Sequence, residues 1–520
     1  MYRQNEINER FYLGDQWHGA GCGDDRPLVR QNVIKRIADY KMSVVGADPI
    51  SVTFSAAGVA QTEQSRTELE RWRAGELSDT CDPDVYSSRV AEALSDHFSD
   101  TAERLKFEDL KQRVMLDAYI TGTGILYTYW DDRLDTGLYA DDARTQPIRG
   151  DLMSEILHVD HVYLGDPSVE RLQDQPYLLI AQRKQVEKLK KTAKRYGGSG
   201  WQEIRPDRNA DRDDPLPKAT VLTRLWKEWD EEGVCRVWGM QVAGNTVVRS
   251  PWCLGVSLYP LAVFRWNTRN GCGYGESEIQ HLIPNQIAIN RMITAGVWST
   301  MMTGMPIMVV NGDVVTQPIT NDPGQIVPVY GSGEDVERAI RYVDPPAYSS
   351  QFHTGISNLI SETLSQAGVS SVMLGDVYPN NASAIIALQD ASLKPLQLIR
   401  NRMFGFCEEV ARIWAEFWIA MYGRRPLRLH HQNGSRYCLF DGDSCSSLLF
   451  SVKVDVEESV TRSPETTLSL LHQLFESGVI TAQQYISRLP DGCIPRQRRL
   501  IREIQEAGFH PSDKETEEAV

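Results

Sequence analysis

The segment GESEIQHLIPNQIAINRMITAGVWSTMM, residues 275–302, decides the fold of this chain. Ser277 and Gln280 have the spacing of a capping box, in which two side chains satisfy free backbone N–H groups at a helix start. Apolar residues then recur at helical spacing, and Arg291 is the only Lys or Arg of the segment. We therefore expect a helix over residues 276–303. Because it offers so few charges to water, we expect another surface to cover it.

A second charge-poor pattern follows at residues 351–374, where Glu362 is the only acid. After it comes a loop, residues 375–383, which contains a glycine, a proline and two asparagines, all strong helix breakers. Apolar steps of three and four then continue over residues 384–422. This spacing predicts one very long helix, which Pro395 should kink near its start.

The two charge-poor patterns flank residues 304–350, which have the composition of a small β-module. The stretches MPIMVV, QIVPVY and IRYV are rich in β-branched residues and are separated by turn residues. The acids of the module are Asp313, Asp322, Glu334, Asp335, Glu337 and Asp344, and its bases are Arg338 and Arg341. The module is therefore acidic.

The remainder of the chain predicts a mixed α+β protein. Residues 27–45 and 104–120 have one apolar helical face each, whereas ILYTYW, VLTRLW, CRVWGMQV and LYPLAVFRW are typical of strands. Gly244 and Asn245 predict a hairpin turn after CRVWGMQV. A further β segment, LLFSVKVDVEES, precedes two short helices joined at Gly478 and an acidic tail.

Composition limits the class of protein. The 520 residues carry 55 Lys and Arg against 70 Asp and Glu, a net charge of -15, which argues against wrapping a polyanion. The nine cysteines include no Cys-x-x-Cys pair, so free thiols in a reducing cytosol are expected rather than disulfides or a zinc site. The sequence predicts neither a signal peptide nor a membrane span.

The order of these elements resembles that of the portal proteins of tailed bacteriophages. The resemblance covers most of the chain and rests on FYLGDQW, RPLVRQN, YPLAVFRWNTRNGCGYGESEIQHLIPNQIAINRMI, SAIIALQDASLKPLQLIRNRM and LLHQLFESGVITAQQYISRLP in that order. It implies a portal fold assembled as a ring. The implied parts are a wing (1–275), a first stem helix (276–303), a clip (304–350), a second stem helix (351–374), a tunnel loop (375–383), a return of the wing (384–460) and a crown with its acidic tail (461–520).

The resemblance also implies a function. Portal proteins form rings, usually of twelve subunits, at one capsid vertex of the virion, after assembly in the host cytoplasm. They nucleate head assembly with the major capsid and scaffolding proteins, and dock the terminase large subunit. They conduct double-stranded DNA and later hold head-completion, adaptor and tail proteins. In such a ring, neighbours would bury the charge-poor helices.

The resemblance implies a role for three sets of residues, and for no catalytic, cofactor or metal site. The tunnel loop would present Asp376, Val377, Tyr378, Pro379, Asn380 and Asn381 to DNA without a basic group that would bind phosphate. Partner docking on the clip would use Glu334, Asp335 and Glu337. Contact of the crown with packaged DNA would use Arg496, Arg498, Arg499 and Arg502.

Other interpretations stay open. A structural adaptor would form a ring without conducting DNA and would make no demand on the loop. A metal-dependent hydrolase would draw on Asp151, His158, Asp160, His161 and Asp166, although EILHVDHVYLGD is more typical of a β segment with polar side chains on its surface. The motif GCGYGE departs from the nucleotide fingerprint at Glu276. The basic run Arg183–Arg195 is typical of a solvated helix face.

Overall fold

The computed structural model describes most of the chain. The described residues are 2–17, 28–47, 50–56, 83–139, 145, 147–198, 200–207, 216–231, 233–304, 307–315, 318–319, 326–343, 350–369, 382–431, 434–445, 450–456, 471–477, 479–480, 485 and 489. Packing divides the chain into two units. The larger comprises Met1–Ala47, Val52–Val377 and Ser392–Val454, and the smaller comprises Asp48–Ser51, Tyr378–Ala391 and Asp455–Val520. The described elements mix helices with antiparallel sheets, which confirms the α+β class.

Helices dominate the N-terminal part of the larger unit. They are α1 (Tyr2–Leu13), α2 (Val33–Val45), α4 (Pro83–Leu105) and α5 (Phe107–Thr121). The Asn32 side chain caps α2 by accepting a hydrogen bond from the Lys35 N–H. Lys106 adopts a left-handed backbone conformation with φ 52° and separates α4 from α5. The helices predicted over 27–45 and 104–120 are therefore present but begin later.

Antiparallel sheets follow. A three-stranded sheet has the order β3–β2–β9, and a five-stranded sheet has the order β4–β5–β6–β7–β8. Their strands are β2 (Thr123–Tyr139), β3 (Pro147–Leu157), β4 (Val162–Leu164), β5 (Tyr177–Gln185), β6 (Lys218–Trp229), β7 (Cys235–Ala243), β8 (Thr246–Cys253) and β9 (Leu261–Arg265). Ala243 pairs with Thr246 across Gly244 and Asn245, which confirms the predicted hairpin.

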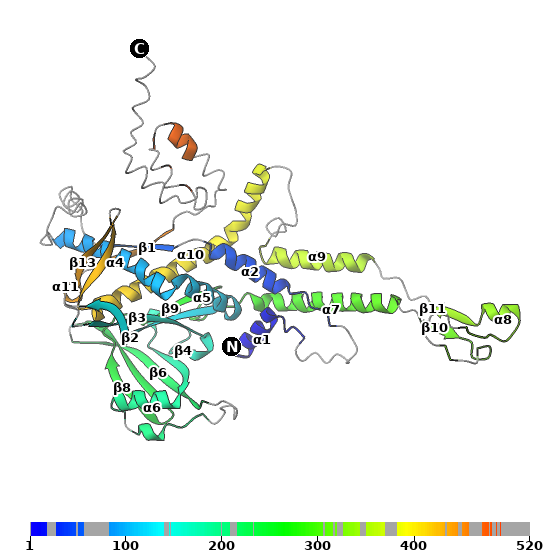
Figure 1. Cartoon of the computed structure of the whole chain (residues 1–520), viewed down its shortest axis with the longest axis horizontal. Coiled ribbons are helices and arrows are strands. Elements are labelled where there is room, and N and C mark those ends of the chain that lie inside the picture. The colour runs from blue at the N-terminus through cyan, green and yellow to red at the C-terminus, as the bar shows by residue number, and fades with distance from the viewer. Residues whose placement is uncertain are drawn as a thin grey trace, which may run out of the picture. The chain divides into compact units, whose positions relative to one another are not determined.

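Short helices connect and cover the sheets. The 3-10 turns are η1 (Val159–His161), η2 (Leu172–Asp174) and η3 (Trp201–Glu203). Helix α6 (Val186–Arg195) packs on the five-stranded sheet, where Val186, Leu189 and Ala193 are buried (Figure 1). Its Lys188, Lys191 and Arg195 are exposed, as expected for a solvated helix face.

The charge-poor patterns form α7 (Ile279–Gly304) and α9 (Ser350–Gln366), which lie side by side in Figure 1. At the start of α7, the Ser277 hydroxyl accepts a hydrogen bond from the Ile279 N–H. Helix α9 ends at Gln366, so the prediction that it continues to residue 374 was wrong. The cause is Gly368, whose φ of 70° lets the chain turn back so that the Val369 N–H bonds to the Leu364 carbonyl.

Between α7 and α9 lies the predicted small module. Its elements are β10 (Ile307–Val310), α8 (Gly333–Glu337) and β11 (Ile340–Val343), with β10 antiparallel to β11. Two of the three expected strands are present. The third, QIVPVY, is not a strand over its described residues 326–330. Instead, Val327 and Val329 pack on a core of Val314, Val315 and Ala339.

The C-terminal part begins with α10 (Ala382–Met421), a single helix that contains Pro395, as the long apolar pattern predicted. After it come β12 (Arg424–His431), β13 (Gly434–Asp441), α11 (Gly442–Cys445) and β14 (Phe450–Val456), and β14 pairs with β1 (Ile50–Ala56). In the larger unit, Trp414 of α10 contacts Phe98 of α4 and Phe107 of α5, with ring centroids 5.0 and 5.5 Å away. Aromatic rings from three helices thus fill this core.

The described residues of the smaller unit's C-terminal segment form a second apolar cluster. Leu471, Ile480 and Leu489 are buried together, and Leu474 and Tyr485 pack against them. Residues 471–476 are helical, in agreement with the first of the two short helices predicted there. Among the helices described, none is both long enough and apolar enough to span a bilayer.

Candidate assembly surface

Polar contacts fix the pairing of α7 with α9. The Asn285 amide donates to Thr363 Oγ1 and to Gln366 Oε1, each at 3.2 Å. Met292 lies beside Gly355, where a Cβ atom would be 3.6 Å from the Met292 Cε atom. Position 285 thus faces the end of α9 and position 292 faces its first half, which makes the helices antiparallel.

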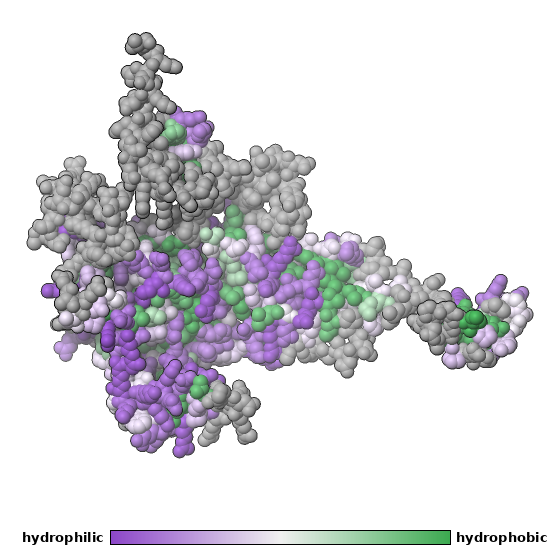
Figure 2. Space-filling model, viewed as in Figure 1, coloured by the Kyte–Doolittle hydropathy of each residue, from purple (hydrophilic) through white to green (hydrophobic). Residues whose placement is uncertain are grey.

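The α7–α9 pair leaves apolar side chains partly exposed. Arg291 is the only Lys, Arg, Asp or Glu in α7, and Glu362 is the only one in α9. Apolar residues of the pair with partial or full exposure include Ile283, Ile287, Met292, Ile293, Val297 and Met301 of α7 and Leu359 and Ile360 of α9. Figure 2 shows hydrophobic surface gathered over this pair. We call these residues the stem surface. An apolar surface of this kind marks an interaction site.

A buried polar stripe along α7, centred on Gln286 and Asn290, holds the N-terminal segment. Gln286 Oε1 accepts from the N–H groups of Val33 and Ile34, at 3.0 and 3.3 Å, and its amide donates to the Gln31 carbonyl at 2.6 Å. One turn later, Asn290 Oδ1 accepts from the Gln31 N–H at 3.2 Å. The spacing of four residues aligns these side chains on one helix face. We call Gln286 and Asn290, with their hydrogen bonds to the N-terminal segment, the clamp. We did not predict the clamp, although polar residues four apart within an apolar helix indicate such a contact.

Thr294 and Gln16 extend the clamp. Thr294 Oγ1 accepts from the Val29 N–H at 3.1 Å, and the Asn290 amide donates to Gln16 Oε1 at 2.6 Å. At the start of α7, Glu278 forms an ion pair with Lys41 of α2 and accepts a hydrogen bond from Trp266 Nε1. Lys41 is buried, so this pair is desolvated and depends on both partners. The first half of α7 is therefore fixed to the N-terminal helices.

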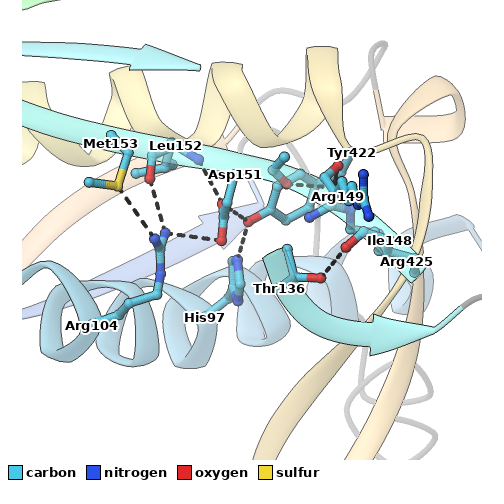
Figure 3. Close-up of polar contacts among 11 residues, drawn as sticks. His97, Arg104, Thr136, Ile148, Arg149, Asp151, Leu152, Met153, Tyr422 and Arg425 are labelled. Atoms are coloured by element: carbon cyan, nitrogen blue, oxygen red, sulfur yellow. Dashed lines mark hydrogen bonds and ion pairs between the residues drawn. The ribbon is translucent and has the colours of Figure 1, made fainter. Parts of the chain in front are cut away.

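A second unpredicted network joins α4, β3, the residue that follows α10 and the start of β12 (Figure 3). The Tyr422 hydroxyl donates to Asp151 Oδ1 at 2.8 Å, and His97 Nε2 lies 2.9 Å from the same hydroxyl. An ionised Asp151 can only accept, so the Tyr422 hydroxyl donates to it, and the tautomer of neutral His97 that suits this arrangement carries its proton on Nε2 and donates to the Tyr422 oxygen. Arg104 forms an ion pair with Asp151 at 3.0 Å, and Arg425 donates to the Gly150 carbonyl at 2.8 Å.

Burial sets the protonation states of this network. Desolvation lowers the pKa of His97 to about 4, although nearby Asp151 and Asp100 oppose the shift. Desolvation also raises the pKa of Tyr422 well above its ordinary value, and the Asp151 carboxylate adds to that effect. Both side chains are therefore neutral near pH 7, and the network acts as a structural tie between the four elements.

The small module carries the described part of the predicted docking site. Glu334 and Glu337 are exposed on α8, while the Asp335 side chain lies outside the described residues. Large apolar side chains are also exposed in the module, namely Val309 (51%), Ile326 (88%) and Tyr330 (68%). Acidic and apolar groups thus lie on one small module, which suits a partner that presents both basic and apolar groups.

Two predicted sets of site residues lie outside the described part of the chain. They are the tunnel-loop residues Asp376, Val377, Tyr378, Pro379, Asn380 and Asn381 and the crown arginines Arg496, Arg498, Arg499 and Arg502. Their roles stay predictions.

The candidate metal ligands have other partners. The prediction of one β segment over EILHVDHVYLGD was wrong in part, because η1 interrupts it. The His158 and His161 ring centroids are 5.9 Å apart. Asp160 accepts from the Asn5 amide at 2.7 Å, and Asp166 accepts from the Ser168 hydroxyl at 2.6 Å. Among the described residues, no three His, Cys, Asp or Glu side chains converge as a metal site requires.

Backbone packing explains the glycines of GCGYGE. A Cβ atom on Gly275 would lie 2.1 Å from the Gly122 carbonyl oxygen, so only glycine fits there. The Gly275 N–H donates to Thr123 Oγ1 at 2.8 Å, and Glu276 pairs with Asn267 in a β-bridge. This motif therefore brings the chain tightly past α5 into α7.

Comparisons with known proteins leave the family open. No protein-family model matches the chain, and no curated protein matches it at a significant level.

Proposed function

We propose that this chain is the portal subunit of a tailed bacteriophage and assembles into a ring around a channel for double-stranded DNA. The observation that carries the proposal is the stem surface, a set of partly exposed apolar side chains on two antiparallel helices with one formal charge each. A monomer gains nothing by exposing such a face, whereas identical copies in a closed ring bury it between neighbours. The helix pair would be the stem, and the module with β10, α8 and β11 would be the clip.

The clip would dock the partners outside the capsid. Its exposed Glu334 and Glu337, with Asp335 on the same helix, would receive the terminase large subunit during packaging and the adaptor and tail proteins afterwards. Exposed Ile326 and Tyr330 would supply apolar contact area that acids alone do not provide. A docking site that is both acidic and apolar would accept successive partners without chemistry of its own.

DNA passage is expected to depend on the tunnel loop. Its residues, Asp376–Ser383, include one acid and no base. Each phosphate contact by Lys or Arg adds salt-sensitive affinity, so a wall without bases leaves the duplex free to slide. Head assembly would place the ring at one vertex among major capsid and scaffolding proteins, with the crown toward packaged DNA.

The decisive experiment is imaging of the purified chain by negative-stain electron microscopy, with native mass spectrometry to count subunits. Rings with a central hole wide enough for a duplex, roughly 20 Å across, support the proposal. Monomers or simple dimers at high concentration would overturn it.

The same apolar helix pair also suits a ring adaptor that conducts no DNA. Basic substitutions in the loop separate these two functions. Asp376→Lys with Asn380→Lys should slow genome packaging and make the delay steeper at low salt, because new phosphate contacts add friction. Asp376→Asn with Asn380→Gln is the matched control and should package normally. Normal packaging by the lysine variant, in rings that form normally, would favour the adaptor.

A further inference from the structure

A cavity of about 470 Å³ lies against the five-stranded sheet and has no role in the proposed ring. Strands β2 and β3 line one side of it, and β5, β6, β7 and β8 line the other. Its volume is within the range of small-ligand sites. The cavity belongs to the larger unit, so a single chain contains all of it.

One row of cross-strand neighbours forms the floor of the cavity. Ile180 pairs with Thr223, Thr223 with Gln241, and Gln241 with Arg249. Directly paired residues lie on the same face of a sheet, so these four side chains point the same way. Helix α6 covers the adjoining part of this face, including Val221. The cavity therefore occupies the part of the face that α6 leaves open.

Aromatic side chains are packed to hold a cation at this floor. The Arg249 guanidinium carbon lies 3.8 Å from the Trp252 ring centroid and 4.2 Å from that of Tyr196. Beneath Trp252 is Gly239, where a Cβ atom would come within 2.7 Å of the indole. The glycine thus lets the indole lie flat on the strand, and Arg249 stacks on the indole.

The opposite side of the cavity offers more aromatic surface. The Tyr127 and Tyr129 rings of β2 are stacked, with centroids 5.7 Å apart and an interplanar angle of 27°. Both residues line the cavity. A planar ring that enters the cavity would meet tyrosines on one side and the Arg249–Trp252 stack on the other.

The lining carries two acids, Asp132 and Glu155, and two bases, Lys184 and Arg249. Glu155 accepts a hydrogen bond from Gln182 at 2.7 Å, and Asp132 pairs with Arg195 at 2.6 Å. Asp132 is therefore paired with a base outside the lining, whereas Glu155 is hydrogen-bonded to a neutral amide and keeps its charge. Arg249 forms no ion pair within 4.0 Å among the described residues. Burial lowers the pKa of its guanidinium, and the more distant Asp132 carboxylate is among the groups that oppose that shift. A partly desolvated guanidinium without an acid is a site for an external anion.

We propose that this cavity binds a planar aromatic molecule that carries an anionic group, with the anion on Arg249 and the ring against the aromatic walls. Lys184, which is exposed at the lining, is placed to add a second positive charge. Nucleoside monophosphates and aromatic carboxylates share this chemistry. The proposal needs one folded chain and does not depend on ring assembly.

Isothermal titration calorimetry on the full chain tests the proposal with AMP, dCMP and 4-hydroxybenzoate. Adenosine and inorganic phosphate serve as probes for the ring and the anion alone. We expect one aromatic anion to bind with a Kd below about 1 mM, and each single-component probe to bind at least about tenfold more weakly. Whether a nucleotide or the carboxylate binds identifies the source of the ligand. Binding of none of the three below that limit would overturn the proposal.

Substitutions make the test specific to the cavity. Arg249→Gln should weaken binding by about tenfold to a hundredfold, as expected for loss of a charged hydrogen bond. Arg236→Gln is the matched control, because Arg236 is exposed on the same sheet and pairs with Asp230. Lys184→Gln, at an exposed position, reports the same loss if the Arg249 variant does not fold. Equal affinity in all folded variants would contradict the site.

Discussion

Replacing Ile287 with glutamate tests the stem surface directly. Ile287 is partly exposed on α7, one residue after the buried Gln286 of the clamp, so the chain's own packing does not cover it fully. In the proposed ring a neighbour buries this side chain. The substitution removes roughly 1.5 kcal/mol or more of apolar burial at each interface. It also places a carboxylate where desolvation costs several kcal/mol. At least about 3 kcal/mol is therefore lost at each interface, a factor of about one hundred in each association constant.

Native mass spectrometry and negative-stain microscopy at matched concentrations measure the effect. We expect Ile287→Glu to remain monomeric under conditions in which the unmodified chain forms rings. Gln280→Glu is the control, because Gln280 is exposed in the first turn of α7, where an acid suits the helix dipole. Urea unfolding of both variants as monomers should agree within about 0.5 kcal/mol, as for other surface changes. Undiminished rings of Ile287→Glu would refute lateral burial of this face.

Three further predictions concern the single chain. Gln286→Leu removes three hydrogen bonds to the backbone of the N-terminal segment, so we expect its free energy of unfolding to fall by about 3 kcal/mol in urea. We also expect protease to cut the N-terminal segment faster, and an unchanged cutting rate would argue against the clamp. The pKa of His97 is about 4 in the folded chain and 6.5 when exposed, so between these values the unfolded state binds a proton that the folded state does not. The free energy of unfolding should therefore fall by up to about 3 kcal/mol as the pH drops from 6.5 to about 4. Urea titrations should show this dependence in the unmodified chain and not in His97→Gln. Gly275→Ala forces a Cβ atom against the Gly122 carbonyl oxygen, so we expect the free energy of unfolding to fall by about 1–3 kcal/mol and the melting temperature to fall with it. Gly312→Ala, which has open space around it, should change neither.

The sequence predicted those elements that periodicity and turn chemistry specify locally. The Ser277 side chain bonded to the first turn of α7, the length of α10 and the hairpin at Gly244 all follow from neighbours in the chain. Errors occurred where one residue overrides the pattern. Gly368 stops α9 although apolar residues continue beyond it, and η1 breaks an apparent strand at His158.

The clamp and the network around Tyr422 were out of reach of local reasoning because their residues are distant in the chain. Gln286 bonds to Val33, and Tyr422 bonds to Asp151, so only the folded chain reveals these partners. The low charge of α7 and α9 was visible in the sequence. Which of their faces stays uncovered was not, because that depends on how the N-terminal segment packs.

The clamp gives the stem surface a physical advantage in assembly. An interface that forms from mobile helices must order them on association, at a cost that reduces affinity. In this chain, Gln286 and Asn290 already tie the first half of α7 to the N-terminal segment, and the Lys41–Glu278 pair anchors its start. The apolar face is therefore presented on a helix whose position is set within one subunit. Weakening the clamp should then raise the concentration needed for ring closure even though the stem surface is unchanged. Native mass spectra of Gln286→Leu, taken under conditions in which the variant stays folded, should show this higher concentration. Rings that close at the same concentration as those of the unmodified chain would show that preorganisation contributes nothing.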